Sequence, residues 1–226
     1  MISFYFNAAP NPMKVALFLE ESGLEYRPVP LDTKLGQQHT PEFLSINPNA
    51  KVPALVDDGV SLFDSNAILL YLAEKTGAFL PQDPALRGPL LSWLFFVASG
   101  VGPYSGQAVH FQHFAADKSP YAVKRYRFEA RRHWQIIDDQ LAKGRYMMGD
   151  DYSVVDMAVW GWAPRIPFML DDETAAGFTN INRLMEELNA RPAAQRALAL
   201  PSQHAFKMEM DDAAIRYMYP HIYSDE

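Results

Sequence analysis

The sequence contains no cysteine among its 226 residues. This absence excludes disulfide frameworks, thiolate metal sites and any cysteine nucleophile that the chain itself could supply. An excess of positive charge is also missing, because 20 Lys and Arg residues stand against 27 Asp and Glu residues, a formal net charge of −7. Such a balance does not favour binding to phosphate backbones, so no nucleic-acid partner is expected.

Long hydrophobic runs are absent too. The most apolar run, residues 90–101, is about a dozen residues long and is interrupted by two serines and a glycine, whereas about 18 residues are needed to span a bilayer. The first residues lack a basic segment followed by a long apolar core, so no signal peptide is expected. The resulting interpretation is a cytoplasmic protein without a membrane partner.

The first eighty residues alternate between strand-like and helix-like patterns. Short runs of β-branched and aromatic residues predict strands at residues 2–6, 25–30, 52–56 and 60–63, and helices are expected to begin near Pro10, Pro41 and Ser65. Pro28 confines the second strand to a sheet edge or to an irregular stretch, and Asp57-Asp58-Gly59 predicts a hairpin between the last two strands. The order β-α-β-α-β-β-α indicates a thioredoxin-like α/β domain, assigned to residues 1–80.

Long helical periods replace this alternation from about residue 85. Three prolines between residues 79 and 89 mark the boundary between two domains. Helices are predicted at residues 87–113, 120–143, about 179–190 and about 192–199, and together they form a bundle. Ser153-Val154-Val155-Asp156 has the form of a capping box that opens a further apolar helix. Residues 87–226 are therefore assigned to an all-α domain.

Two patterns resemble known sites but lack their context, and the motif of a third site is missing. The glycines of residues 100–106 resemble a dinucleotide fingerprint, but the third glycine is one place late and a helical period precedes them instead of a strand. His110 and His113 could share a helix face, but no carboxylate stands at matching spacing, so packing or surface positions are expected and a metal site is not. No Gly-x-Ser-x-Gly elbow supports a hydrolase triad.

The turn after the first strand is the first of three segments that carry chemistry. Thioredoxin-like folds place Cys-x-x-Cys at this turn, because the N-terminus of the following helix stabilises a thiolate. Here the four positions are Ala9-Pro10-Asn11-Pro12. The chain has no thiol of its own at this turn, but the same field would act on a thiol that a ligand brings.

The other two segments could hold the ends of such a ligand. Pro53 is expected to follow a cis peptide bond, which turns the backbone of Val52 outward to pair with an extended peptide, and Lys51 offers a cation for a carboxylate. Asp64 and Ser65 can be plain helix caps, or they can hold an α-ammonium and an α-carboxylate at a helix N-terminus. Together the three segments describe a slot for a short, charged tripeptide with a central thiol, which is glutathione.

The sequence resembles the glutathione S-transferases over nearly its whole length. The resemblance rests on the loop of residues 51–53, on the Asp64–Ser65 pair with the apolar run of residues 67–72, and on the Ser153–Asp156 box. Within the family it is most similar to bacterial nu-class enzymes and to the related transferase-like domain of a yeast nitrogen-regulatory prion protein. The residues behind this finer assignment are Pro10-Asn11, Lys14, Pro41-Glu42-Phe43, Gly102-Pro103, Gly106-Gln107, His110-Phe111, Arg125-Tyr126 and Arg132.

This resemblance implies a glutathione transferase fold, a homodimer, glutathione as co-substrate and no metal. It places Asn11 beside the glutathione sulfur and brings Arg132 from the helical domain towards the site, although an ordinary ion pair on a charged helix is the alternative for Arg132. An electrophile or disulfide would bind in the helical domain. The residues assigned to glutathione are Asn11, Gln38, Lys51, Val52, Pro53, Asp64, Ser65 and Arg132. The residues assigned to the second substrate are Tyr104, Phe111 and Trp162, which taken singly are typical of a core.

One departure from the family bears on mechanism. Many nu-class members have threonine at the position of Ala9, so this chain lacks the hydroxyl that would assist the thiol. The hypothesis is that Asn11 and the turn amides act as catalytic donors instead. Lowering the thiol pKa from about 8.5 to about 6.5 requires about 2.7 kcal/mol, which one charge-assisted hydrogen bond and a helix N-terminus can supply.

The thiolate could attack an electrophilic carbon or a disulfide sulfur, and the resemblance favours disulfide reduction. A module that binds glutathione or apolar ligands without turnover is the alternative, which the alanine at position 9 favours.

Overall fold

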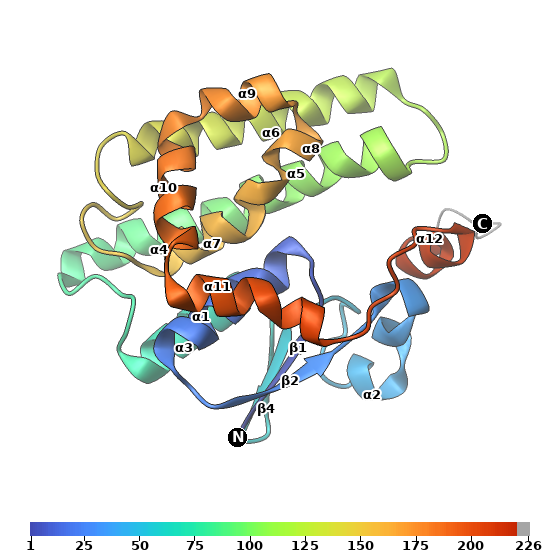
Figure 1. The fold of residues 1–226 in the computed structure, drawn as a ribbon, viewed down its shortest axis with the longest axis horizontal. Coiled ribbons are helices and arrows are strands. Elements are labelled where there is room, and N and C mark those ends of the chain that lie inside the picture. The colour runs from blue at the N-terminus through green and yellow to red at the C-terminus, as the bar shows by residue number, and fades with distance from the viewer. Residues whose placement is uncertain (221–226) are drawn as a thin grey trace. The chain divides into compact units, whose positions relative to one another are not determined.

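The computed structural model describes residues 1–220, which form two compact units (Figure 1). The first unit contains Met1–Tyr71 together with the described residues from Ala193 on, and the second contains Leu72–Pro192. An α/β thioredoxin-like part and an all-helical part are therefore present, as the sequence predicted. The predicted division into residues 1–80 and 87–226 differs from these units in two places, because residues 72–80 belong to the second unit and the segment after Pro192 belongs to the first.

The first unit is built on a four-stranded mixed sheet with the order β2-β1-β3-β4. Its strands are β1 (Ile2–Phe6), β2 (Tyr26–Pro30), β3 (Ala54–Asp57) and β4 (Val60–Phe63). β2 runs parallel to β1 at an edge, as Pro28 predicted, and β3 is antiparallel to both of its neighbours. The hairpin between β3 and β4 has positive φ at Asp58 (47°) and Gly59 (88°), as a type I′ turn requires.

Helices follow three of these strands. α1 (Pro10–Ser22) begins with a proline at its first position, where no N–H is needed, and ends at Gly23, whose φ of 69° is left-handed. Two short 3₁₀ turns (Thr33–Leu35 and Gln37–His39) and α2 (Pro41–Leu44) follow β2. α3 (Ser65–Thr76) follows β4.

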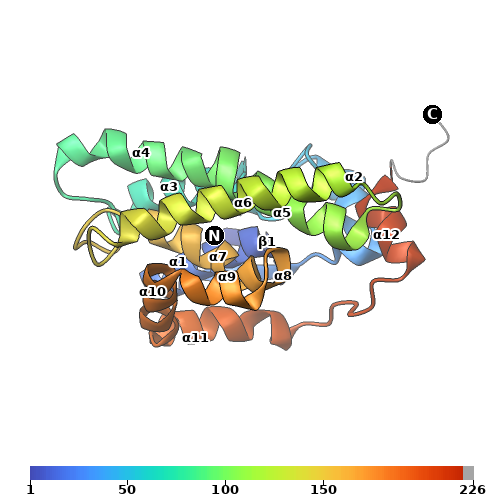
Figure 2. The same ribbon diagram turned by 90° about the horizontal axis from the view of Figure 1, so that it is seen from above.

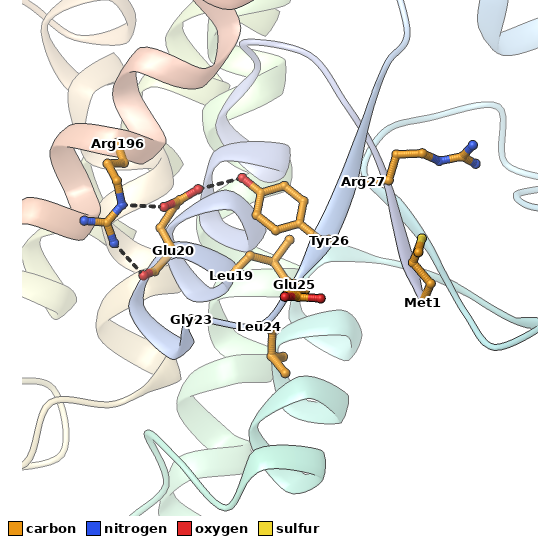
Figure 3. A pocket seen from close by; sticks show the side chains of 9 residues that line it. All are labelled: Met1, Leu19, Glu20, Gly23, Leu24, Glu25, Tyr26, Arg27 and Arg196. Carbon is orange, nitrogen blue, oxygen red and sulfur yellow. Dashed lines mark hydrogen bonds and ion pairs between the residues drawn. The ribbon is translucent and has the colours of Figure 1, made fainter.

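The helix α11 (Pro192–Ala199) lies in the first unit from Ala193 on, whereas the sequence predicted that this helix completes the helical bundle. Arg196 donates to Glu20 in α1, through Nε to Oε2 at 2.7 Å and through Nη2 to the backbone oxygen at 2.9 Å. Tyr26 Oη donates to the other carboxylate oxygen of Glu20 at 2.7 Å (Figure 3). Burial and this hydrogen bond raise the pKa of Tyr26. The two hydrogen bonds of Arg196 thus fix α11 to α1, and Ala193, Ala194 and Ala197 are the buried residues of α11.

The segment after α11 also returns to the first unit. His204 and Phe206 pack edge-on against Phe6, with ring centroids 5.4 and 6.0 Å away. The Lys207 N–H donates to Asp32 Oδ2 at 2.5 Å. α12 (Asp212–Met218) then lies on the 3₁₀ turn Thr33–Leu35, and both views place it beside the helical turns that follow β2 (Figures 1 and 2).

The second unit is helical throughout. Its helices are α4 (Arg87–Phe96), α5 (Gly102–Val109), α6 (Pro120–Leu141), α7 (Val154–Trp162), α8 (Ile166–Met169), α9 (Asp172–Gly177) and α10 (Thr179–Asn189). α5 and α6 lie side by side (Figures 1 and 2), and Trp134 in α6 donates to Ser105 Oγ in α5 at 3.0 Å. Trp134 and Trp160 are among the largest fully buried side chains of this unit.

A continuous helical stretch, Pro84–Phe114, opens this unit through α4, α5 and two π-helical turns. The stretch has 31 residues and is long and apolar enough to cross a membrane by length and composition alone. The most apolar run of the sequence, residues 90–101, covers only about a dozen of these residues, so no such segment was predicted. This is weak evidence for a membrane span, because core helices of soluble proteins pass the same test.

The predicted capping box at the start of α7 is confirmed. Ser153 Oγ accepts the N–H of Val155, and Asp156 Oδ2 accepts the N–H of Ser153 at 2.9 Å. Asp156 is fully buried, and its Oδ1 also accepts the N–H of Met147 at 2.8 Å. Burial raises the pKa of Asp156 to about 6, although the hydrogen bonds that its carboxylate accepts act in the opposite direction.

Candidate functional site

The register of the sheet brings the three predicted segments to one edge. Tyr5 in β1 pairs with Ala54 in β3, and Ala54 pairs with Phe63 in β4. Because each of these neighbouring pairs is antiparallel, the end of β1, the start of β3 and the end of β4 meet at the same edge. The turn after β1, the loop before β3 and Asp64 at the start of α3 therefore converge, as the sequence predicted.

The turn before α1 offers few hydrogen-bond donors. Ala9 is the N-cap of α1 and makes no side-chain capping bond. Its N–H donates to Asn7 Oδ1 at 2.9 Å, the N–H of Met13 donates to the Ala9 oxygen at 3.3 Å, and both prolines of the turn have no N–H. The other N–H groups of residues 9–13 belong to Asn11, in its backbone and in its side-chain amide. Asn11 is half-buried at the second position of the helix.

The loop before β3 has the predicted backbone conformation. The peptide bond between Val52 and Pro53 is cis. The paired part of β3 begins at Ala54, so the Val52 backbone lies just outside the hydrogen-bond ladder of the sheet. The loop is held by the buried Asn47, whose Nδ2 donates to the Lys51 oxygen at 2.5 Å, and the Lys51 side chain is exposed.

Asp64 caps α3. Its Oδ1 accepts the N–H groups of Asn66 at 2.9 Å and Ala67 at 3.1 Å. Its φ of 68° lies in the left-handed region, so the chain turns sharply between β4 and α3. The capping role that the sequence left open is thus present. The side chain is also exposed, so capping is compatible with contact to a ligand ammonium.

A buried lysine joins the starts of α1 and α3. Lys14 is 1% exposed, and its Nζ donates to Ser65 Oγ and Asn66 Oδ1, each at 3.2 Å. Burial lowers the pKa of Lys14 to about 7, against the opposing effect of the Asp64 carboxylate. From the sequence, Lys14 is only a mark of family resemblance and has no predicted role. A signal was present, because Lys14 is the single charged residue in the buried run of residues 12–19.

Gln38 lies beneath α12. It is 3% exposed, and its Nε2 donates to the Tyr217 backbone oxygen at 2.9 Å. Its Oε1 is buried and has no hydrogen-bond partner within residues 1–220. The predicted contact between Gln38 and the tripeptide therefore requires α12 to move away from this segment.

Gly36→Ala is expected to detach α12. A Cβ at Gly36 would lie 2.6 Å from Tyr217 Cδ1, and the φ of 77° disfavours any side chain. Tryptic cleavage after Arg216 should become faster by about tenfold, because proteolysis follows the population of the opened tail. Gly23→Ala is the matched control, since its φ is 69° and nothing lies within 4 Å of its added Cβ. Equal cleavage rates in the two variants would show that Tyr217 does not hold the tail.

Arg132 makes the ion pair that the sequence left as its alternative role. Its Nε donates to Glu129 Oε2 at 2.9 Å, and Arg125 Nη1 donates to the other carboxylate oxygen at 2.8 Å. The hydrogen bond from Arg132 is the main reason that the pKa of Glu129 lies below its usual value. An approach of Arg132 to glutathione stays a prediction.

The three aromatic residues assigned to the second substrate are all half-buried. Tyr104 and Phe111 both contact Tyr126, with ring centroids 6.3 and 5.2 Å away. Trp162 lies against α5, where a Cβ on Gly102 would be 3.4 Å from its Nε1. Ring contacts are typical of a core and partial exposure is typical of a pocket wall, so their role in binding stays a prediction.

A hollow of about 600 Å³ opens at the opposite edge of the sheet from these segments (Figure 3). It is lined by Met1, Leu19, Glu20, Gly23, Leu24, Glu25, Tyr26, Arg27 and Arg196. The hollow lies at the starts of β1 and β2, whereas the candidate site lies at the end of β1, so the two are separate. Within residues 1–220, no group of three or more His, Asp or Glu side chains is arranged to hold a metal ion.

Comparison with known proteins supports the fold. Residues 2–74 match the family described as the N-terminal domain of glutathione S-transferase, and residues 100–192 match its C-terminal domain. The disulfide-bond oxidoreductase YfcG of Escherichia coli is 42% identical over 205 residues, covering 88% of this chain and 94% of that protein. The transcriptional regulator URE2 of Saccharomyces cerevisiae is 44% identical over 151 residues, covering 63% of this chain and 43% of that protein.

Solved structures of glutathione transferases are also similar to this chain. A glutathione transferase from Burkholderia graminis, with two glutathione molecules bound per subunit, has a TM-score of 0.83 and 37% identity, over 90% of this chain and 89% of that one. A glutathione transferase from Pseudomonas putida, with one glutathione disulfide bound per subunit, has a TM-score of 0.82 and 34% identity, over 88% and 91% of the two chains. The two matching domains and the nearly complete coverage of the Escherichia coli relative show that this chain belongs to the glutathione S-transferase family.

Proposed function

We propose that the protein binds glutathione at the edge of the sheet where the Asn11 turn, the Val52 loop and the start of α3 converge. This convergence is the observation that carries the proposal. The cysteine sulfur would lie at Asn11, the peptide backbone would pair with Val52, and the γ-glutamyl end would lie at Asp64 and Ser65. These residues supply a hydrogen-bond donor, an extended backbone edge and a charged end, which match the three parts of the tripeptide.

The reaction that we propose is glutathione-dependent disulfide reduction. The bound thiolate attacks one sulfur of a disulfide, the S–S bond breaks, and the released thiolate takes a proton from water. A second glutathione thiolate then attacks the mixed disulfide and releases the second thiol, again with a proton from water. The net change converts one disulfide and two glutathiones into two thiols and glutathione disulfide. The chain needs no thiol for either step.

The relatives support this reaction over conjugation to an electrophilic carbon. The Escherichia coli relative is named a disulfide-bond oxidoreductase, and the Pseudomonas putida structure holds glutathione disulfide, the oxidised product of the proposed reaction. The Burkholderia graminis structure holds two glutathiones per subunit, the number that the reaction consumes. We further propose that the protein is a cytoplasmic homodimer. Arg132 would lie near the thiol, and the disulfide would lie near Tyr104, Phe111 and Trp162.

Binding without turnover is the second candidate function. The N-cap position before Asn11 is an alanine that makes no side-chain capping bond, so the turn has no hydroxyl to assist a thiol. The relative from Saccharomyces cerevisiae is named a transcriptional regulator. Under this alternative, the same edge would retain glutathione but would not activate it.

Asn11→Ala is expected to lower kcat/KM for disulfide reduction by about tenfold or more at pH 7. The reason is that the loss of a charge-assisted hydrogen bond raises the thiol pKa by about one and lowers the thiolate fraction accordingly. The assay supplies glutathione and hydroxyethyl disulfide and follows NADPH consumption through a coupled glutathione reductase. Ultraviolet absorbance of the bound thiolate against pH reads the thiol pKa directly.

Asn11→Asp is the matched variant, because it keeps the shape of the side chain and places a negative charge near the sulfur. It should raise the thiol pKa further than Asn11→Ala does. Normal turnover by Asn11→Ala would contradict the role of Asn11. Retention of the wild-type protein on glutathione resin without any turnover would favour the binding module.

A further inference from the structure

The ammonium of Lys14 stands behind the candidate ligand site and away from solvent. Its Nζ lies 3.2 Å from Ser65 Oγ and 3.2 Å from Asn66 Oδ1, and the side chain is 1% exposed. Ser65 is the residue to which the proposed function assigns the γ-glutamyl carboxylate. Lys14 would therefore act on that carboxylate through the Ser65 hydroxyl, as a positioning residue.

The charge of Lys14 is only partly compensated. Its contacts on α3 are a neutral hydroxyl and a neutral amide, and Asp64 is the carboxylate that favours its protonated form. Asp64 is exposed, and its Oδ1 already accepts the N–H groups of Asn66 and Ala67. Burial outweighs this attraction and holds the pKa of Lys14 at about 7, so both protonation states are populated near neutral pH.

The two protonation states of Lys14 orient the hydroxyl proton of Ser65 in different directions. A protonated lysine has three donors and no acceptor, so Ser65 Oγ accepts from it and the hydroxyl proton points elsewhere, available to a ligand carboxylate. A neutral amine has a lone pair that can accept the Ser65 hydroxyl proton and turn it away from the ligand. Carboxylate binding and protonation of Lys14 should therefore favour each other.

We propose that Lys14 takes up a proton from the solvent when a carboxylate binds at Ser65. The proton passes from a buffer acid to Nζ, and no other bond changes. A carboxylate oxygen hydrogen-bonded to Ser65 Oγ would lie about 4 to 6 Å from Nζ, a separation at which an opposite charge raises proton affinity by about 10- to 1000-fold. This inference rests on the proposed binding of glutathione at Ser65.

Calorimetric titration with S-hexylglutathione at pH 8 tests the proposal, because this probe carries no thiol that could titrate. Two buffers with different heats of ionisation give the number of protons taken up. Between about 0.4 and 0.9 proton per protein is expected, since Lys14 starts mostly neutral at this pH and becomes protonated on binding. The same linkage should weaken the affinity by about 5- to 50-fold between pH 7 and pH 9.

Three variants isolate Lys14 as the source of the proton. Lys14→Met should bind the probe without this uptake and with a flatter pH dependence. Lys14→Arg should also show no uptake, because a guanidinium stays charged in this range. Lys124→Met removes an exposed lysine of α6 and should keep the wild-type proton count.

The possible outcomes separate this inference from the proposed function. No binding heat in the wild-type protein would overturn the glutathione proposal and this inference with it. Binding by the wild-type protein without proton uptake would overturn the inference alone. Equal proton uptake by wild type and Lys14→Met would also overturn the inference, because the proton would then bind to another group.

Discussion

Asp156→Ala is expected to lower the free energy of unfolding by about 4 kcal/mol. The Asp156 carboxylate is fully buried and accepts the backbone N–H groups of Met147 and Ser153. Truncation leaves two buried donors without their acceptor, at about 1 to 3 kcal/mol each, and one of these donors is the Ser153 N–H of the capping box of α7. For a chain of this size, the melting temperature should fall by about 8 to 16 °C.

Tryptophan fluorescence is the direct measurement, because all four tryptophans of the sequence (Trp93, Trp134, Trp160 and Trp162) lie in the second unit. Asp151→Ala is the control, since it removes an exposed aspartate five positions earlier in the chain. A loss of less than about 1 kcal/mol in Asp156→Ala would mean that water or a shifted backbone satisfies the two donors.

Lys14→Met is expected to change how stability depends on pH. The unfolded chain keeps this lysine protonated up to about pH 10.5, whereas the folded protein loses the proton near pH 7. Between these values the unfolded state binds more protons, so a rise in pH stabilises the folded wild-type protein. The stability of wild type relative to Lys14→Met should therefore rise by about 2 kcal/mol between pH 7 and pH 9.

The measurement is urea unfolding of both proteins at pH 7, 8 and 9, followed by circular dichroism. Lys124→Met, which makes the same change in net charge at an exposed position, should run parallel to wild type. Parallel curves for wild type and Lys14→Met would instead show that Lys14 keeps an ordinary proton affinity in the folded protein.

Local features of the fold could be predicted because their causes are local. The first and last strands, residues 2–6 and 60–63, have the predicted bounds, since aromatic and β-branched runs end at clear turn residues. The third strand begins at Ala54, two residues later than predicted, because Pro53 cannot donate to the ladder. The capping box at Ser153 was predictable because both of its hydrogen bonds lie within one turn of helix.

Features that depend on distant residues could not be predicted in the same way. A helical period shows that α11 has a face to bury, but it does not show that Arg196 on this helix binds Glu20, which lies far away in the sequence. The hydrogen-bond partners of Lys14 likewise lie far away in the sequence, at Ser65 and Asn66 in α3. The convergence of the candidate site was predictable only because the fold was recognised, whereas the cover of Gln38 by α12 had no sequence signal.

The return of the chain's last segments to its first unit has a consequence for biosynthesis. Glu20 and Asp32 are translated long before Arg196 and Lys207, the residues that they bind. The helical unit is one uninterrupted segment, so all of its residues have been synthesised before Arg196 emerges from the ribosome. The part of the protein that is translated first is thus the last to be completed, and a nascent chain truncated before residue 196 would expose the surfaces that these late partners cover.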